Sequence, residues 1–191
     1  MQLTTQTKLE LDLEQQYVMD HAKLLGLEPK LIYHSKSTST CQEKLDLLQE
    51  THPGDWTLNQ MVKALYFRGH GELWGIITPE EGRIPTEDIF AEILGIKHKK
   101  AKGYRPCAAE RLPLHMEPGT CTPFPLASSM GYEITGLIVL NKPELQGRLV
   151  DISVGGIHEK SHRTSMHLPY DAIHSILKAE FDDYVHLWKQ Q

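Results

Sequence analysis

The sequence predicts an α+β fold with a mixed, largely antiparallel sheet flanked by helices. Two strand-like runs, 61–68 (MVKALYFR) and 72–78 (ELWGIIT), are joined by Gly-His-Gly, which is typical of a β-hairpin. Segments with helical spacing of apolar residues, such as 85–95, alternate with these strands. The connections are too short for a doubly wound parallel sheet, whose strands need long crossovers.

Length and composition predict one soluble globular domain. The chain has 191 residues and a net charge of −5, which does not indicate a strongly basic nucleic-acid binder. We expect a polar leader at 1–9 and a single domain over 10–191. No apolar run has the length of a signal peptide core or a membrane span. The cysteines, Cys41, Cys107 and Cys121, are odd in number and widely spaced, so we expect a cytoplasmic protein without a disulfide framework.

The first third of the chain alternates helix and strand. Apolar residues from Leu11 onward lie on one helical face, and Gly26 follows as a stop. Residues 30–34 (KLIYH) predict a short strand. Thr40 precedes Glu43 by three residues, the spacing of a capping box, so a second helix should begin there. A loop is expected over 51–56.

Lys63 stands in the middle of the first hairpin strand, and both faces of this strand are largely apolar. Such a strand predicts a sheet covered on both sides. By the period of two, Lys63 shares a face with Leu65 and Phe67. Because burying a lone ammonium group is costly, this lysine must reach solvent at a strand edge, pair with a carboxylate, or line a cavity.

The second half of the chain returns to the same elements. Residues 85–95 predict a helix, with acids in its first turn and a glycine at its end. The remaining expectations are a basic strand edge at 96–105, a helical turn at 107–112, a loop at 116–124, strands at 135–141, 147–153 and 163–168, and a helix from Pro169 through Trp188.

Residues 158–162 read HEKSH and match the H-E-x-x-H string of many zinc peptidases. That chemistry requires a helix, because only a helix points histidines at i and i+4 toward one metal ion. Here the string follows a strand and two glycines, and the further histidine of the extended motif would fall on Leu168. The sequence therefore favours a polar loop without a metal, and a zinc hydrolase is the least favoured alternative.

Other common catalytic motifs are missing from the sequence. It contains no G-x-S-x-G, Walker or dinucleotide-binding motif, and none of the cysteines has a family-specific flank. The basic segment within 96–105 can meet phosphate groups of a nucleic acid or form an ordinary solvated face. Its candidate phosphate contacts are Lys97, Lys99, Lys100, Lys102 and Arg105.

Three features occur in an order that resembles the YbaK/prolyl-tRNA-synthetase-associated domain family, which consists of aminoacyl-tRNA deacylases and editing domains. They are Lys63 in MVKALYF, the loop EPGTCTPF at 117–124, and the strand VDISVGG at 150–156. The resemblance runs from about residue 10 to residue 180. It implies an editing-domain-like fold and trans-acting hydrolysis of the ester in mischarged tRNA. The implied partners are the acceptor end of tRNA and, secondarily, an aminoacyl-tRNA synthetase, with no membrane.

The resemblance also implies a set of site residues. Lys63 would contact the substrate near the ester, and the loop at Gly119 would offer backbone N–H groups to the developing oxyanion. Since an aminoacyl ester is already activated, such a site needs a positioned water and no cofactor or metal. The implied substrate-binding residues are Thr120, Cys121, Thr122, Pro123, Ser153, Gly155 and His115.

Three positions depart from the family pattern. His115 stands where the loop commonly begins with glycine, Thr122 stands where serine is common, and Asn141 stands where aspartate is frequent. These departures bear on the shape of the pocket and thus on the amino acid it accepts. They also keep open a second hypothesis, a non-catalytic module of the same fold that binds tRNA or a synthetase.

Overall fold

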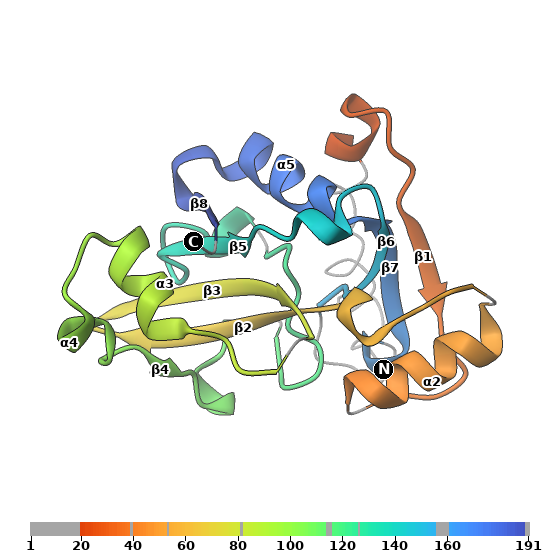
Figure 1. The fold of residues 1–191 in the computed structure, drawn as a ribbon, viewed down its shortest axis with the longest axis horizontal. Coiled ribbons are helices and arrows are strands. Elements are labelled where there is room, and N and C mark those ends of the chain that lie inside the picture. The colour runs from red at the N-terminus through yellow and green to blue at the C-terminus, as the bar shows by residue number, and fades with distance from the viewer. Residues whose placement is uncertain are drawn as a thin grey trace, which may run out of the picture.

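The computed structural model describes residues 20–38, 40–52, 54–80, 82–113, 116–125, 127–155 and 161–189. They form one eight-stranded mixed sheet with helices packed around it (Figure 1). Four of its strand pairings are antiparallel and three are parallel, so the expected α+β class with a largely antiparallel sheet is confirmed. The expected leader at 1–9 lies outside the described residues.

The strands follow one path across the sheet, and β4 is a short addition to β2. The order is β1 (Lys30–Tyr33), β7 (Thr164–Pro169), β6 (Leu149–Ser153), β2 (Met61–Gly69), β3 (Glu72–Pro79), β5 (Gly136–Leu140) and β8 (Val185–Trp188), with β4 (Arg105–Pro106) against β2.

The helices are α2 (Cys41–Thr51), α3 (Thr86–Ile93), α4 (His98–Ala101) and α5 (Tyr170–Phe181). Short 3₁₀ turns cover Leu58–Gln60, Ala109–Arg111, Ala127–Ser129, Pro143–Leu145, Ser161–Arg163 and Asp182–Tyr184. The capping box at Thr40 is confirmed, since its hydroxyl accepts from the Glu43 backbone and the Glu43 carboxylate accepts from the Thr40 backbone. Of the predicted first helix, residues 20–24 are described and helical, and Gly26 ends it at a φ of 70°.

Two hydrophobic clusters lie on the two faces of the hairpin sheet, as the apolar faces of its first strand predict. Val62, Ala64 and Tyr66 belong to the cluster that includes the buried face of α5. Phe67 belongs to the other cluster, where it packs against Phe90 of α3 with ring centroids 5.7 Å apart. None of the helices within the described ranges is long and apolar enough to cross a bilayer.

Two of the expected elements were wrong. The basic segment is not a strand edge over its length, because its middle forms α4 and only Arg105–Pro106 pairs with β2. The C-terminal helix does not reach Trp188, because Asp182 breaks it at a φ of 33°. The chain then forms β8, which pairs in parallel with β5. The apolar residues Val185 and Trp188, three positions apart, are compatible with a helix or with a strand that is buried on both faces. The segment is a strand because it pairs with the edge of β5.

On the edge of β2 opposite β3, the strand pairing is interrupted, and the site lies at this interruption. Met61 and Val62 pair with β6, and Phe67 and Arg68 pair with β4. Among the described residues, no strand pairs with positions 63–66 on this edge. The backbone between the two pairings therefore faces a space that loops and side chains enclose, and Lys63 begins this stretch.

Gly136 is required by close packing between β5 and β3. A Cβ at this position would lie 2.4 Å from Cζ3 of Trp74, whose side chain is buried. We expect Gly136→Ala to lower the free energy of unfolding by about 2 kcal/mol, since the core cannot absorb the methyl group without shifting a large ring. Chemical denaturation measures the loss. Gly54→Ala is the control, because its Cβ would make contacts no closer than 3.5 Å; equal losses in both variants would contradict the steric explanation.

Candidate active site

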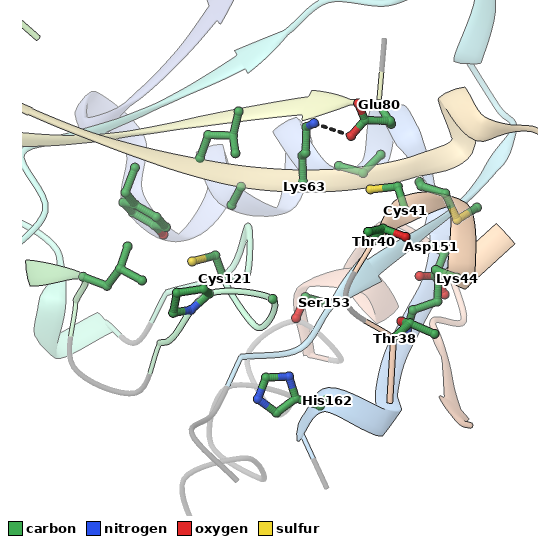
Figure 2. A pocket seen from close by; sticks show the side chains of 18 of the residues that line it. Thr38, Thr40, Cys41, Lys44, Lys63, Glu80, Cys121, Asp151, Ser153 and His162 are labelled. Carbon is green, nitrogen blue, oxygen red and sulfur yellow. Dashed lines mark hydrogen bonds and ion pairs between the residues drawn. The ribbon is translucent and has the colours of Figure 1, made fainter. Parts of the chain in front are cut away.

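A pocket of about 730 Å³ occupies the gap beside β2. Its walls come from β2, the first turn of α2, the segment around η2 (Ala109–Arg111), the loop at Gly119, and the ends of β6 and β7 (Figure 2). The volume lies in the range of small-molecule sites, roughly 300–1,000 Å³. The lining side chains with charged, thiol, hydroxyl or imidazole groups are Thr38, Thr40, Cys41, Lys44, Lys63, Tyr66, Glu80, Cys107, Cys121, Asp151, Ser153, His162 and Thr164.

The pocket brings together four of the residues predicted from the sequence. Lys63, Gly119, Cys121 and Ser153 line it, although they come from three segments far apart in the chain. Gly119 has a φ of 93°, a left-handed conformation that favours glycine, so the tight turn of the loop depends on this residue. The arrangement therefore joins the hairpin, the loop and the β6 strand at one cavity.

The other predicted substrate-binding residues that the structure describes do not line the pocket. Thr120 and Thr122 are buried within the loop, where the Thr120 hydroxyl donates to the Glu117 carbonyl and the Thr122 hydroxyl accepts from the Phe124 backbone. Both threonines therefore hold the shape of the loop. Pro123 and Gly155 are buried too, while His115 lies outside the described residues.

Lys63 forms an ion pair with Glu80, and both side chains are partly buried. Glu80 follows β3, two residues beyond Thr78, which is the register partner of Lys63. Burial raises the pKa of Glu80, but hydrogen bonds from Lys63 and from the Cys41 thiol outweigh it, and the net pKa is lowered. The Glu80 carboxylate is therefore ionised at neutral pH, and Lys63 meets the pocket as an ion-paired side chain.

Lys44 and Asp151 form a second charged group of the pocket wall. Burial lowers the pKa of Lys44, and the negative charge of Asp151 opposes this shift. Asp151 is only 4% exposed and accepts hydrogen bonds from the Ser165 hydroxyl and, at 3.0 Å, from Nε2 of His167. The carboxylate of Asp151 is thus fixed by two buried donors, and Asp151 also lines the cavity.

Ser165, His34 and Asp151 are the three residue types of a serine hydrolase, but their arrangement does not fit that role. Nε2 of His34 lies 2.8 Å from the Ser165 hydroxyl, which itself donates to Asp151. A nucleophile must reach its substrate. Ser165 is fully buried and does not line the pocket. The three residues therefore form a structural network that joins β1, β6 and β7.

His34 makes the stability of this network depend on pH. Burial, followed by the charge of Lys44, lowers the pKa of His34 to about 4 from an ordinary value of 6.5. Because Ser165 donates to Asp151, Nε2 of His34 must donate to Ser165, and a second proton would fall on Nδ1. That atom is buried and has no hydrogen-bond partner within the described part of the chain.

The free energy of unfolding should therefore fall as the pH drops from 6.5 to 4. In this window the unfolded chain binds a proton at His34 that the folded chain does not, and the expected contribution is roughly 2–3 kcal/mol. Denaturation at several pH values measures this effect. In His34→Gln the decrease in the free energy of unfolding between pH 6.5 and pH 4 should be smaller by this amount. His98→Gln changes an exposed histidine and should leave it unchanged. Parallel curves for His34→Gln and the unmodified protein would refute the assignment.

All three cysteines line the pocket as free thiols. Burial raises the pKa of Cys41 and of Cys121 to about 11, so both are protonated at neutral pH. A thiolate is the nucleophilic form of cysteine. Cys41 and Cys121 therefore supply soft, weakly polar surface to the cavity and not a nucleophile.

The basic segment lies away from the pocket. Lys97, Lys99, Lys100, Lys102 and Arg105 are exposed around α4, at the turn end of the β2–β3 hairpin (Figure 1). Lys102 forms an ion pair of 3.7 Å with Glu87. Arg105 pairs with Arg68, five residues along β2 from Lys63, which corresponds to roughly 17 Å. These residues form an exposed cationic surface at the end of the hairpin that lies opposite the pocket.

The HEKSH string is described only at its end. His158 and Glu159 lie outside the described residues, whereas His162 lines the pocket and its Nε2 lies 2.6 Å from Oε1 of Glu117. Among the described residues, no three His, Cys, Asp or Glu side chains are placed to hold one metal ion.

Sequence reasoning missed Lys44, Glu80, Asp151 and His162 as pocket residues. The hairpin register contains a signal for Glu80, because a residue two positions beyond the partner of Lys63 shares its face. Asp151 stood as an acid within a predicted strand, which is a weak signal of a buried polar role. Lys44 and His162 have no comparable local signal, since their positions depend on how α2 and the segment after β6 fold back.

Comparison with known proteins shows the fold. No protein-family model and no curated protein sequence matches this chain. Its structure is similar to that of the hypothetical protein APE2540, with a TM-score of 0.59, 19% identity, and coverage of 90% of this chain and 97% of the other. It is also similar to a proposed trans-editing enzyme for prolyl tRNA synthetase, with a TM-score of 0.61, 14% identity, and coverage of 92% and 95%.

A third similar structure comes from work on grafting epitopes onto scaffold proteins by computational design. Its TM-score is 0.56 at 11% identity, with coverage of 93% of this chain and 96% of the other. These likenesses extend over nearly the whole of each chain. They confirm the expected editing-domain-like fold, and at these identities they concern the fold alone.

Proposed function

We propose that this protein is a trans-acting deacylase that hydrolyses the aminoacyl ester of mischarged tRNA. The observation that carries the proposal is the convergence of Lys63, Gly119, Cys121 and Ser153 on one pocket. The fold likeness to a proposed trans-editing enzyme for prolyl tRNA synthetase supports it. The partner is then the acceptor end of an aminoacyl-tRNA, with an aminoacyl-tRNA synthetase as the second candidate.

The chemistry suits a site of this composition. Hydrolysis of an activated ester needs a positioned water and donors for the developing oxyanion. We assign the backbone at Gly119 to the oxyanion, because a glycine on the wall lets the ligand approach the main chain closely. We assign Lys63 to binding another oxygen of the substrate near the ester. Glu80 forms an ion pair with this lysine at the pocket.

The pocket lining bounds the ligand. Backbone and side chains of β2, from Met61 to Phe67, provide a largely apolar wall, while Lys44, Lys63, Glu80 and Asp151 contribute charges. A ligand with both an apolar group and polar ends fits this division, and an amino acid esterified to a ribose has this character. We assign Lys97, Lys99, Lys100, Lys102 and Arg105 to phosphates farther along the tRNA, where each contact makes binding weaker at higher salt.

The test is deacylation of a panel of mischarged tRNAs, with the unmodified protein and Lys63→Ala in parallel. At least one member of the panel should be cleared by the unmodified protein and much more slowly by the variant. If the variant clears every member equally fast, the catalytic proposal is wrong. Tight binding of tRNA or of a synthetase without ester hydrolysis would instead favour a non-catalytic binding module with the same fold.

A further inference from the structure

His162 and Glu117 form a pair at the pocket that the family resemblance does not include. The distance from Nε2 of His162 to Oε1 of Glu117 is 2.6 Å, and the side chains are 26% and 39% exposed. His162 lines the pocket, whereas Glu117, at the start of the Gly119 loop, is not one of its lining residues. His162 is therefore the member of the pair that meets the cavity, and Glu117 holds its Nε2.

The hydrogen bond determines which nitrogen of His162 is basic. An ionised carboxylate only accepts hydrogen bonds, so Nε2 carries the proton and donates it to Glu117. In the neutral ring the lone pair then resides on Nδ1. A Cβ built on Gly119 would lie 3.5 Å from Nδ1 and 3.6 Å from Cε1. The basic edge of the ring therefore faces the glycine to which the oxyanion is assigned.

We propose that Glu117 and His162 form a dyad in which His162 is the general base for the attacking water. This inference rests on the proposed function and adds a catalytic residue to it. Nδ1 takes a proton from water as the water oxygen bonds to the ester carbonyl carbon. The resulting oxyanion lies against the backbone at Gly119. When the tetrahedral intermediate collapses, the imidazolium returns the proton to the departing ribose oxygen, leaving a free amino acid and an uncharged tRNA end.

The position of Lys63 agrees with this division of roles. Figure 2 shows Lys63 extending toward Glu80 at one end of the pocket, while His162 lies at the other end, beyond Ser153. The ammonium group of Lys63 is already engaged by Glu80, and it lies at the opposite end of the pocket from the His162 ring. We assign Lys63 to binding, Glu117 to positioning the ring, and His162 to proton transfer.

The experiment compares single-turnover rates of the unmodified protein, His162→Ala, Glu117→Gln and the double variant. Two substrates are used, the mischarged tRNA panel and p-nitrophenyl esters of amino acids. General base catalysis contributes roughly 100-fold or more, so His162→Ala should lose about that factor in rate constant at saturation. Glu117→Gln should lose roughly 10-fold without weaker binding, and the double variant should be no slower than His162→Ala.

Adding imidazole to the buffer distinguishes a catalytic role of His162 from a structural one, because only a missing general base can be replaced by free imidazole. It should restore part of the rate to His162→Ala and nothing to Lys63→Ala. His21→Ala is the matched control, because His21 forms a 3.3 Å pair with Glu180 at similar exposure and does not line the pocket. Its rate should equal that of the unmodified protein.

The outcomes separate the dyad from the proposed function. If His162→Ala keeps the full rate on a substrate that the unmodified protein hydrolyses, the dyad is refuted and the deacylase stands. If the protein hydrolyses the nitrophenyl esters but no tRNA, the proposed function fails, and the response of those esters to His162→Ala still decides the dyad. If it hydrolyses neither substrate, both proposals fall.

Discussion

Replacing Lys63 by methionine should slow the clearance of mischarged tRNA by roughly 10- to 100-fold. A hydrogen bond to a charged group is worth about 1.5–3 kcal/mol, and each 1.4 kcal/mol changes a rate about tenfold. Methionine keeps most of the length and the apolar stem of lysine, so the β2 strand should remain packed. The measurement is the rate of release of the amino acid from a tRNA that the unmodified protein clears.

The ion pair with Glu80 offers a second explanation for a slower rate in Lys63→Met. Removing Lys63 alone leaves a partly buried carboxylate in the pocket, which would itself repel an anionic substrate. The double variant Lys63→Met/Glu80→Gln removes both charges and should still be slow, because the binding cation is gone. Recovery of the full rate in the double variant would show that Lys63 only neutralises Glu80.

A control is available elsewhere on the chain. Lys178 forms a 3.0 Å ion pair with Asp182 at the end of α5, and neither residue lines the pocket. Lys178→Met should leave the clearance rate unchanged. A comparable slowing in this variant would mean that the measurement responds to general charge or stability and not to the pocket.

Asp151→Ala should lower the free energy of unfolding by about 3 kcal/mol, the largest expected effect on stability. The carboxylate accepts hydrogen bonds from Ser165 and His167, and all three side chains are buried. Without it, two buried donors lose their acceptor, and each unsatisfied group costs about 1–3 kcal/mol. For a chain of this length the melting temperature should fall by roughly 6–12 °C.

Two further variants test this explanation. Asp151→Asn keeps the shape and one acceptor oxygen, so its loss should be smaller, about 1–2 kcal/mol. Asp183→Ala changes an exposed residue of the turn after α5 and should stay within about 0.5 kcal/mol of the unmodified protein. A loss for Asp151→Ala no larger than that of Asp183→Ala would exclude a role of the network in stability.

Local patterns in the chain were sufficient for most elements of this fold. The hairpin follows from two apolar runs around Gly-His-Gly, and α2 follows from the spacing of Thr40 and Glu43. Such signals act over a few residues, where backbone geometry and capping hydrogen bonds decide the structure. The choice between helix and strand at Val185–Trp188 was different, because it depended on a partner strand more than 40 residues earlier.

Some residues of the site could be predicted from local sequence, and others could not. An unusual residue type in a regular pattern, such as Lys63 in an apolar strand or Gly119 in a turn, is visible in the sequence because it breaks a local rule. The partners of these residues are not visible, since Glu80, Asp151 and His162 reach the cavity through strand register and loop closure.

His162 illustrates the difference. In the sequence it is the last residue of HEKSH, a match to a zinc-binding motif on a segment that lacks the helix such chemistry requires. In the folded chain it lies against Gly119 and Glu117, 45 positions from that glutamate in sequence. The residue types and their local spacing determined the elements of this protein and its polar candidates. Which of those candidates share a cavity was decided only by long-range packing, because no local interaction specifies a contact across that distance.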